Sequence, residues 1–259
     1  MDNANYTDIN AATIDRWVAD GWSWGIPITR EEYARAKNGE WDVLLTPTKT
    51  VPHEWFEPFL RDGRFGGAKF LGLASGGGQQ MPIFAALGAE CTVLDYSDAQ
   101  LASEKLVSER EGYAIDIVKA DMTKRLPFDD SAFDVIFHPV SNCYIEDVQH
   151  VWDECFRVLK CGGVLLAGMD NGLNFLIEKD EEPLVIANKL PFNPLKNPEQ
   201  LVLLAACDDG VQFSHSLEEQ LGGQLKAGLR LTDLFEDYND SGALAKYAPC
   251  YIATRAVKP

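Results

Sequence analysis

Between residues 68 and 170, short apolar runs alternate with longer segments in which apolar residues recur at helical spacing. The runs are rich in β-branched and aromatic residues, which is typical of buried strands. Strands that alternate with helices of this length predict βαβ units, and therefore an α/β fold with a doubly wound, mostly parallel sheet. The five predicted strands span residues 68–74, 90–96, 114–120, 132–139 and 163–169.

The segments between these runs carry helix signals. Ser97 or Asp98 follows the second strand and is expected to cap the next helix. Residues 145–160 hold the clearest apolar stripe of helical period, and Gly162–Gly163 predicts a glycine C-cap at the end of that helix. These helices supply the crossovers that parallel strands require.

The regular alternation stops near the end of the fifth predicted strand. Residues 171–215 carry several prolines and one short apolar helix candidate at 199–207. Residues 216–228 have a helical pattern again, in spite of their central glycines. Two further apolar runs, 229–237 and 249–259, predict a closing pair of strands, which makes seven strands in all.

The first 65 residues form a different kind of segment, because they hold five of the chain's six tryptophans. We expect an N-terminal extension that is helical around 10–20 and packs on the main domain to bury those rings. Trp17 and Trp41 are expected to fasten the extension down. Trp22, Trp24 and Trp55 either do the same or line a ligand pocket.

Charge and composition narrow the function classes. The 259-residue chain has 23 basic and 40 acidic residues, a net charge of −17, and no cluster of Lys and Arg. We therefore expect neither a nucleic-acid partner nor an anionic membrane surface. No apolar stretch is long enough for a membrane span, no signal peptide is recognised at the N-terminus, and the six cysteines form no C-x-x-C pair. A cytoplasmic protein with reduced thiols and no metal site is the expectation.

The stretch FLGLASGGGQQ (70–80) ends the first predicted strand and is the main candidate for a ligand-binding turn. In open α/β sheets, ligands bind beyond the carboxyl ends of the strands, and glycines let a ligand approach the backbone closely. A dinucleotide fingerprint that starts at Gly76 fails at Met81, and no Gly-Lys-Ser/Thr of a P-loop follows. The spacing of Gly72, Gly76 and Gly78 matches short-chain dehydrogenases, but the only Tyr-x-x-x-Lys lies upstream at 33–37.

A third register of the same stretch resembles the class I S-adenosylmethionine-dependent methyltransferases. Their acidic-x-Gly-x-Gly-x-Gly pattern falls on Gly72, Ala74, Gly76 and Gly78, so the acid and the first glycine are absent here. The segments KADMTKRLPFDDSAFDVIF (119–137) and RVLKCGGVLLAG also resemble that family, and the resemblance covers roughly residues 50–170. It implies a Rossmann-like methyltransferase fold in which the last two strands form an antiparallel hairpin.

The resemblance also implies roles for single residues. Asp95, at the end of the second strand, would accept hydrogen bonds from both ribose hydroxyls, and Tyr96 would lie against the adenine. Asp121 would take the adenine amino group, with Met122 beside the ring. A helix cap at Asp95, a solvated loop position for Asp121 and core packing for Tyr96 and Met122 stay open as alternatives. The full set of implied cofactor contacts is Ala74, Ser75, Gly76, Gly78, Asp95, Tyr96, Asp121, Met122 and Pro139.

The acceptor side is less defined in the sequence. In FHPVSNCYIED, which follows the fourth strand, His138 is a candidate base or acceptor ligand and Asn142 a candidate acceptor contact. A histidine that is hydrogen-bonded only for structural reasons is the alternative. Trp22, Trp24 and Trp55 are the other candidates for acceptor binding.

The hypothesis is a methyltransferase that moves a methyl group from S-adenosylmethionine to a small-molecule acceptor by in-line displacement. A short-chain-type NAD(P)-dependent oxidoreductase and a non-catalytic S-adenosylmethionine-binding module are the alternatives, and a monomer and a homodimer both stay open. We expect a lid at 1–65, a cofactor-binding core at 66–170, an insertion over the site at 171–215, and a closing helix and strands at 216–259.

Overall fold

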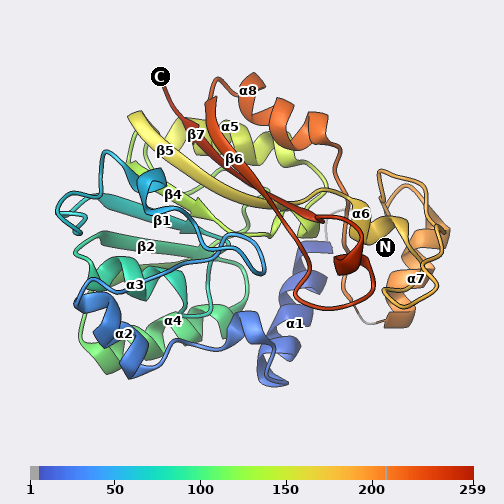
Figure 1. The fold of residues 1–259 in the computed structure, drawn as a ribbon, viewed down its shortest axis with the longest axis horizontal. Coiled ribbons are helices and arrows are strands. Elements are labelled where there is room, and N and C mark those ends of the chain that lie inside the picture. The colour runs from blue at the N-terminus through green and yellow to red at the C-terminus, as the bar shows by residue number, and fades with distance from the viewer. Residues whose placement is uncertain (1–5, 208) are drawn as a thin grey trace.

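The computed structural model describes residues 6–207 and 209–259, which form a twisted sheet with helices on both faces (Figure 1). Seven strands make up the sheet, in the order β3-β2-β1-β4-β5-β7-β6. Their bounds are Lys69–Leu73 (β1), Glu90–Asp95 (β2), Ile115–Lys119 (β3), Phe133–His138 (β4), Leu159–Asp170 (β5), Arg230–Asp237 (β6) and Tyr251–Val257 (β7).

Strands β1 to β5 pair in parallel, and β7 runs antiparallel to both β5 and β6. The predicted fold, a mostly parallel seven-stranded sheet with an antiparallel C-terminal pair, is therefore confirmed. The chain enters the sheet at β1 and builds outward on both sides, so the strand order reverses between β1 and β4. The carboxyl ends of the strands at such a switch point are where ligands bind in open α/β sheets.

The helices that bear on the function divide between the two faces and the ligand end of the sheet. In Figure 1, α3 and α4 cover one face, α5 and α8 cover the other, and α1, α6 and α7 lie toward the end where the parallel strands finish. The α-helices are Tyr6–Ala19 (α1), Arg30–Lys37 (α2), Gln80–Ala86 (α3), Asp98–Glu111 (α4), Val148–Val158 (α5), Leu173–Leu176 (α6), Pro198–Cys207 (α7) and Gly223–Lys226 (α8). A π-helical turn, Glu218–Gly222, leads into α8.

Two of the expected helix ends can be compared with the structure. Ser97 is the N-cap of α4, and its hydroxyl accepts the backbone N–H of Gln100 at 3.1 Å. The glycine C-cap predicted for α5 is wrong, because that helix ends at Val158 and passes directly into β5. Lys258 satisfies the end of α5 instead, since its ammonium donates to two carbonyls there, those of Phe156 and Leu159.

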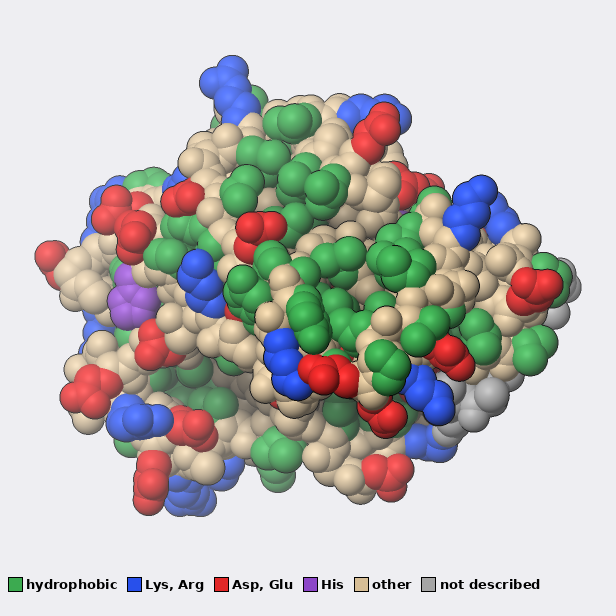
Figure 2. Space-filling model, turned by 45° about the vertical axis from the view of Figure 1, so that its right-hand side comes forward, with side chains coloured by type: hydrophobic (Ala, Val, Ile, Leu, Met, Phe, Trp, Pro, Cys, Tyr) green, Lys and Arg blue, Asp and Glu red, His purple; other side chains and the backbone are tan. Residues whose placement is uncertain are grey.

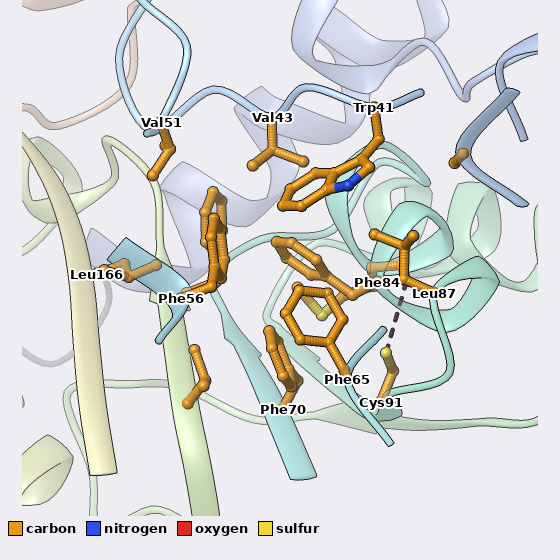
Figure 3. Packing of buried hydrophobic residues seen from close by; sticks show 14 of the residues in the cluster. Trp41, Val43, Val51, Phe56, Phe65, Phe70, Phe84, Leu87, Cys91 and Leu166 are labelled. Atoms are coloured by element: carbon orange, nitrogen blue, oxygen red, sulfur yellow. Dashed lines mark hydrogen bonds between the residues drawn. The ribbon is translucent and has the colours of Figure 1, made fainter. Parts of the chain in front are cut away.

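Residues 41–65 of the N-terminal extension belong to the hydrophobic core itself. Trp41, Phe56 and Phe65 pack on one another and on Phe70 and Phe84 of the sheet and of α3 (Figure 3). A second cluster of buried apolar side chains fills the opposite face of the sheet, under α5. Helix α1 of the extension lies outside this cluster and is placed to act as a cover. Among the described residues, no helix is long and apolar enough to cross a membrane.

Candidate functional site

A cavity of about 340 Å³ opens at the carboxyl ends of β1 to β5, at the switch point of the sheet. Helix α1 and the segment around Leu45 to Pro47 close over it. Figure 2, which brings the right-hand side of Figure 1 forward, shows hydrophobic side chains gathered at the centre of this side of the molecule. Ten residues singled out from the sequence line the cavity: Trp22, Trp24, Ala74, Ser75, Gly76, Asp95, Tyr96, Asp121, Met122 and Pro139.

The glycine turn is shaped by close contacts to the protein itself. Ala74 has a φ of +47°, in the region that favours glycine, and its N–H donates to the Leu94 carbonyl at 2.8 Å. A Cβ on Gly76 would lie 2.6 Å from the Cβ of Gln100 and 3.0 Å from Oδ2 of Asp95. The turn therefore needs glycine to fit against α4, and this leaves its other side open to the cavity.

Gly78 does not line the cavity. Its N–H donates to Oε1 of Glu104 at 2.8 Å, and a Cβ there would lie 2.8 Å from the Ser103 carbonyl. The cofactor contact expected of Gly78 is thus replaced by packing of the turn on α4. Glu104 is fully buried, and burial raises its pKa to about 8.

Asp95 lies at the centre of the cavity wall, at the end of β2. Its two carboxylate oxygens accept the N–H groups of Gly76 and Ser97, each at 3.0 Å. A carboxylate has about four acceptor sites, so two remain for a ligand. Burial raises the pKa of Asp95, while these two hydrogen bonds act in the opposite direction. The residue thus ties the turn to the start of α4 and still offers acceptors to the cavity.

The space beside Gly72, where related sequences carry an acid, is occupied by Met81. A Cβ on Gly72 would lie 2.9 to 3.1 Å from three atoms of the buried Met81 side chain. The sequence could not show this, because the two residues meet only when α3 packs on β1. Gln80 is a polar group that sequence analysis missed; it lines the cavity, and its Oε1 accepts the Ser75 hydroxyl at 3.2 Å.

Replacing Gly72 with alanine is expected to destabilise the protein by about 1–3 kcal/mol through overpacking against Met81. The G72A/M81A double variant should be more stable than the sum of the two single changes predicts, because M81A removes the obstructing atoms. Urea unfolding of the three variants measures this coupling. Strict additivity would show that the two side chains do not compete for one space.

Two acceptor candidates at the end of β4, His138 and Asn142, do not line the cavity. His138 is buried and does not line the cavity; its Nδ1 lies 2.8 Å from the Leu73 carbonyl and its Nε2 2.8 Å from the amide of Asn142. Asn142 is equally buried and bonds to Gln220 of the π-helical turn. Desolvation lowers the pKa of His138. This chain of side chains is a structural network, so His138 is not placed to act on a ligand in the cavity.

Trp55 is a second correction among the acceptor candidates. Its ring is only 2% exposed, packs on Phe235 and donates from Nε1 to Asp233 at 2.9 Å. It therefore fastens the extension to β6. Trp41 has the anchoring place expected of it, buried and stacked on His53. Trp17 packs against Trp22 at the rim, with ring centroids 5.4 Å apart.

Helix α1 covers the cavity through polar contacts to the residues that follow β2. Asp8 accepts the Tyr96 hydroxyl at 2.7 Å, and Asp15 accepts the Ser97 hydroxyl at 2.5 Å. On its other side, the Asn10 amide donates to the carbonyls of Tyr144 and Val211, both at 2.9 Å. The helix therefore bridges the end of β2 and the segments on the far side of the cavity.

Sequence analysis missed most of the cavity wall beyond β4. These residues come from strand ends, short helical turns and loops that carry no motif, although Asp170 could have been suspected from its place at the end of a predicted strand. The missed lining residues on this side include Thr46, Ser141, Cys143, Tyr144, Asp170, Asn174, Phe175, Gln212 and Tyr251.

Comparisons with known proteins identify the family. The model of a family described as "Methyltransferase domain" matches residues 71–167. The uncharacterized methyltransferase YbaJ of Bacillus subtilis is 40% identical over 254 residues, which cover 96% of this chain and 97% of YbaJ. The protein belongs to the class I S-adenosylmethionine-dependent methyltransferases. S-adenosylmethionine is its cofactor.

Solved structures of other methyltransferases share the fold at low sequence identity. An S-adenosylmethionine-dependent methyltransferase from Mesorhizobium loti has a TM-score of 0.57 and 17% identity, over 77% of this chain and 93% of its own. Geranyl diphosphate C-methyltransferase from Streptomyces coelicolor, solved with S-adenosyl-L-homocysteine, has a TM-score of 0.54 and 14% identity, over 80% and 77%. The family assignment excludes the dehydrogenase alternative. Tyr33, from the upstream Tyr-x-x-x-Lys, stacks on Tyr113 in the core.

The cavity of this methyltransferase suits the chemistry of its cofactor. S-adenosylmethionine carries ribose hydroxyls, an adenine amino group and an ammonium group, all of which donate hydrogen bonds. Asp95 and Asp121 line the cavity and supply acceptors. The donor groups of the cofactor thus meet carboxylate acceptors on this wall.

Proposed function

We propose that this methyltransferase acts on a small-molecule acceptor and is an active enzyme rather than a binding module. The observation that supports this most is the cover over the cavity. Helix α1, the segment around Leu45 to Pro47 and the residues after β5 all line a space of about 340 Å³. A site that is covered in this way admits a small acceptor more readily than a side chain on a large, folded partner.

In the proposed arrangement, the chain binds the cofactor between β1, β2 and β4. Asp95 holds the ribose hydroxyls, and Asp121 holds the adenine amino group with Met122 and Tyr96 beside the ring. Ser75, Gly76 and Gln80 surround the amino-acid end, where the Gln80 amide stands in for the acid that Gly72 lacks. The cofactor supplies an electrophilic methyl group, and the protein contributes alignment of the acceptor and exclusion of water.

Acidic residues outnumber basic ones in this protein, 40 to 23, which disfavours an anionic partner. Among the residues that the structure describes, no Lys, Arg or His lines the cavity. Lys and Arg side chains are scattered over the face that Figure 2 shows, and the chain as a whole has a net charge of −17. These features favour a small acceptor and argue against nucleic acid.

Replacing Asp95 with alanine is expected to weaken binding of S-adenosylhomocysteine by about 1.5–3 kcal/mol, since hydrogen bonds to a charged group are lost. Isothermal calorimetry with S-adenosylhomocysteine measures the change, and thermal unfolding checks that the turn is still folded. Asp98→Ala is the matched control, because Asp98 is exposed, pairs with Lys119 and does not line the cavity. Equal affinities for the wild type and D95A would refute the ribose role.

A further inference from the structure

Asp170 is a buried carboxyl group on the acceptor side of the cavity. It is the last residue of β5 and lies opposite Tyr251 in the register of β7. Strand β4 separates β5 from β1, so Asp170 lies two strands away from the glycine turn. It lines the same cavity as Asp95 and Asp121. A ligand that fills the cavity from the glycine turn outward therefore reaches Asp170 at its far end.

The hydrogen bonds of Asp170 hold its carboxyl group in place without saturating it. Oδ1 accepts the N–H of Gly172, and Oδ2 accepts the Asn174 amide, each at 2.5 Å. The Asn174 amide is itself fixed, because its Oδ1 accepts from Asn239 at 2.9 Å. One acceptor site remains on each carboxylate oxygen. The group is thus oriented as a general base has to be, with free lone pairs on a cavity wall.

The surroundings of Asp170 raise its pKa toward neutral pH. Burial raises its pKa to about 6, and no Lys, Arg or His in the described part of the chain lines the cavity to oppose this. The titratable groups that face it are the thiols of Cys143 and Cys250 and the Tyr251 phenol, whose pKa values burial also raises. All three are uncharged at neutral pH. Asp170 is therefore the group on this side of the cavity that can take up a proton near pH 7.

The walls around Asp170 favour a flat, uncharged ligand. Tyr144, Phe175 and Tyr251 supply aromatic surface, and Leu45 and Ile145 add aliphatic surface. An anionic acceptor would face carboxyl groups with no cation to compensate it. An alkylammonium acceptor has no free lone pair until it is deprotonated, and its pKa is several units above that of Asp170. A hydroxyl group keeps its lone pairs and can lose its proton while the new bond forms.

We propose that Asp170 is the general base for methyl transfer to a small, uncharged aromatic hydroxyl compound, an inference that rests on the proposed function. A lone pair of the acceptor oxygen forms the new O–C bond to the methyl carbon. The electron pair of the broken C–S bond stays on sulfur and removes its positive charge. The hydroxyl proton passes to the Asp170 carboxylate, so the products are the methyl ether, S-adenosylhomocysteine and a protonated Asp170.

The test uses purified protein, tritiated S-adenosylmethionine and three matched probes: catechol, benzoate and benzylamine. Tritium is expected in catechol, with transfer to the anion and to the cation at least about 10-fold slower. For catechol, kcat/KM should fall below about pH 6 as Asp170 becomes protonated. Asp170→Asn should lower kcat by about 100-fold or more and abolish this acidic limb. Its affinity for S-adenosylhomocysteine should stay within about twofold of the wild type.

Asp170→Ser serves as a second variant, and thermal unfolding of both reports whether the loop after β5 is intact. Retained turnover or a retained acidic limb in folded D170N and D170S would overturn the role of Asp170. Faster transfer to benzoate or benzylamine, or transfer to none of the probes while S-adenosylhomocysteine still binds, would overturn the acceptor class. If the wild-type protein does not bind S-adenosylhomocysteine at all, the proposed function itself is overturned.

Discussion

Glu104→Gln is expected to stabilise the protein at pH 8 by up to about 4 kcal/mol relative to the wild type. Glu104 is fully buried in α4, and burial raises its pKa from 4.5 to about 8. Above pH 4.5 the unfolded chain releases this proton while the folded protein keeps it, so the wild type loses stability as the pH rises toward 8. Glutamine has no proton to lose and can still accept the Gly78 N–H through Oε1.

Urea unfolding at pH 5 and pH 8 measures this effect. The advantage of E104Q should be small at pH 5 and should grow toward pH 8, because ionisation of Glu104 increasingly stabilises the unfolded wild-type chain while the folded protein keeps this carboxyl protonated. Glu109→Gln is the matched control, since Glu109 lies on the exposed side of the same helix, where it pairs with Lys105. Parallel pH profiles for the wild type and E104Q would contradict the prediction.

Trp55→Ala is expected to destabilise the protein by about 3–5 kcal/mol, the usual cost of removing a buried aromatic ring. The ring packs on Phe235, and its Nε1 donates to Asp233 of the same strand. Trp55→Phe keeps part of the ring contact but loses the hydrogen bond and some packed volume, so it should cost about 1–3 kcal/mol. Chemical unfolding of both variants gives the two values.

Unfolding and S-adenosylhomocysteine binding, measured together, separate an anchoring tryptophan from one that lines the site. Trp24 is partly exposed and lines the cavity, whereas Trp55 does not line it. Trp24→Ala should therefore lower the affinity for S-adenosylhomocysteine with little loss of stability. Trp55→Phe should leave that affinity nearly unchanged. A cofactor affinity that falls in W55F as much as in W24A would return Trp55 to the candidate site.

The part of the cavity around the glycine turn was predictable because its residues sit at positions that strand ends define. Asp95 ends β2, the glycine turn follows β1, and Asp121 follows β3. A parallel sheet gathers such ends at one edge, so a pattern of strands and turns suffices to place them together. Gly78 was assigned wrongly because a glycine can serve packing on the protein as well as approach by a ligand.

The acceptor half was not predictable in the same way. His138 and Asn142 were sensible candidates by their position after β4, but their side chains point into a network with Gln220, 78 residues away from Asn142 in the chain. Asp170 carries no motif, and its importance comes from the cavity that α1 and the loops close around it. Exposure and burial of a side chain depend on what packs over it, which a local pattern does not contain.

The sequence by itself determined the alternation of strands and helices, the switch point and the family, since these follow from hydrophobic period, turn residues and motif order. Only the tertiary structure decided which side chains face the cavity, that Met81 occupies the place beside Gly72, and that Trp55 is an anchor. The physical reason is that the first set depends on neighbours along the chain. The second set depends on contacts between segments far apart in it, such as Trp55 with Phe235.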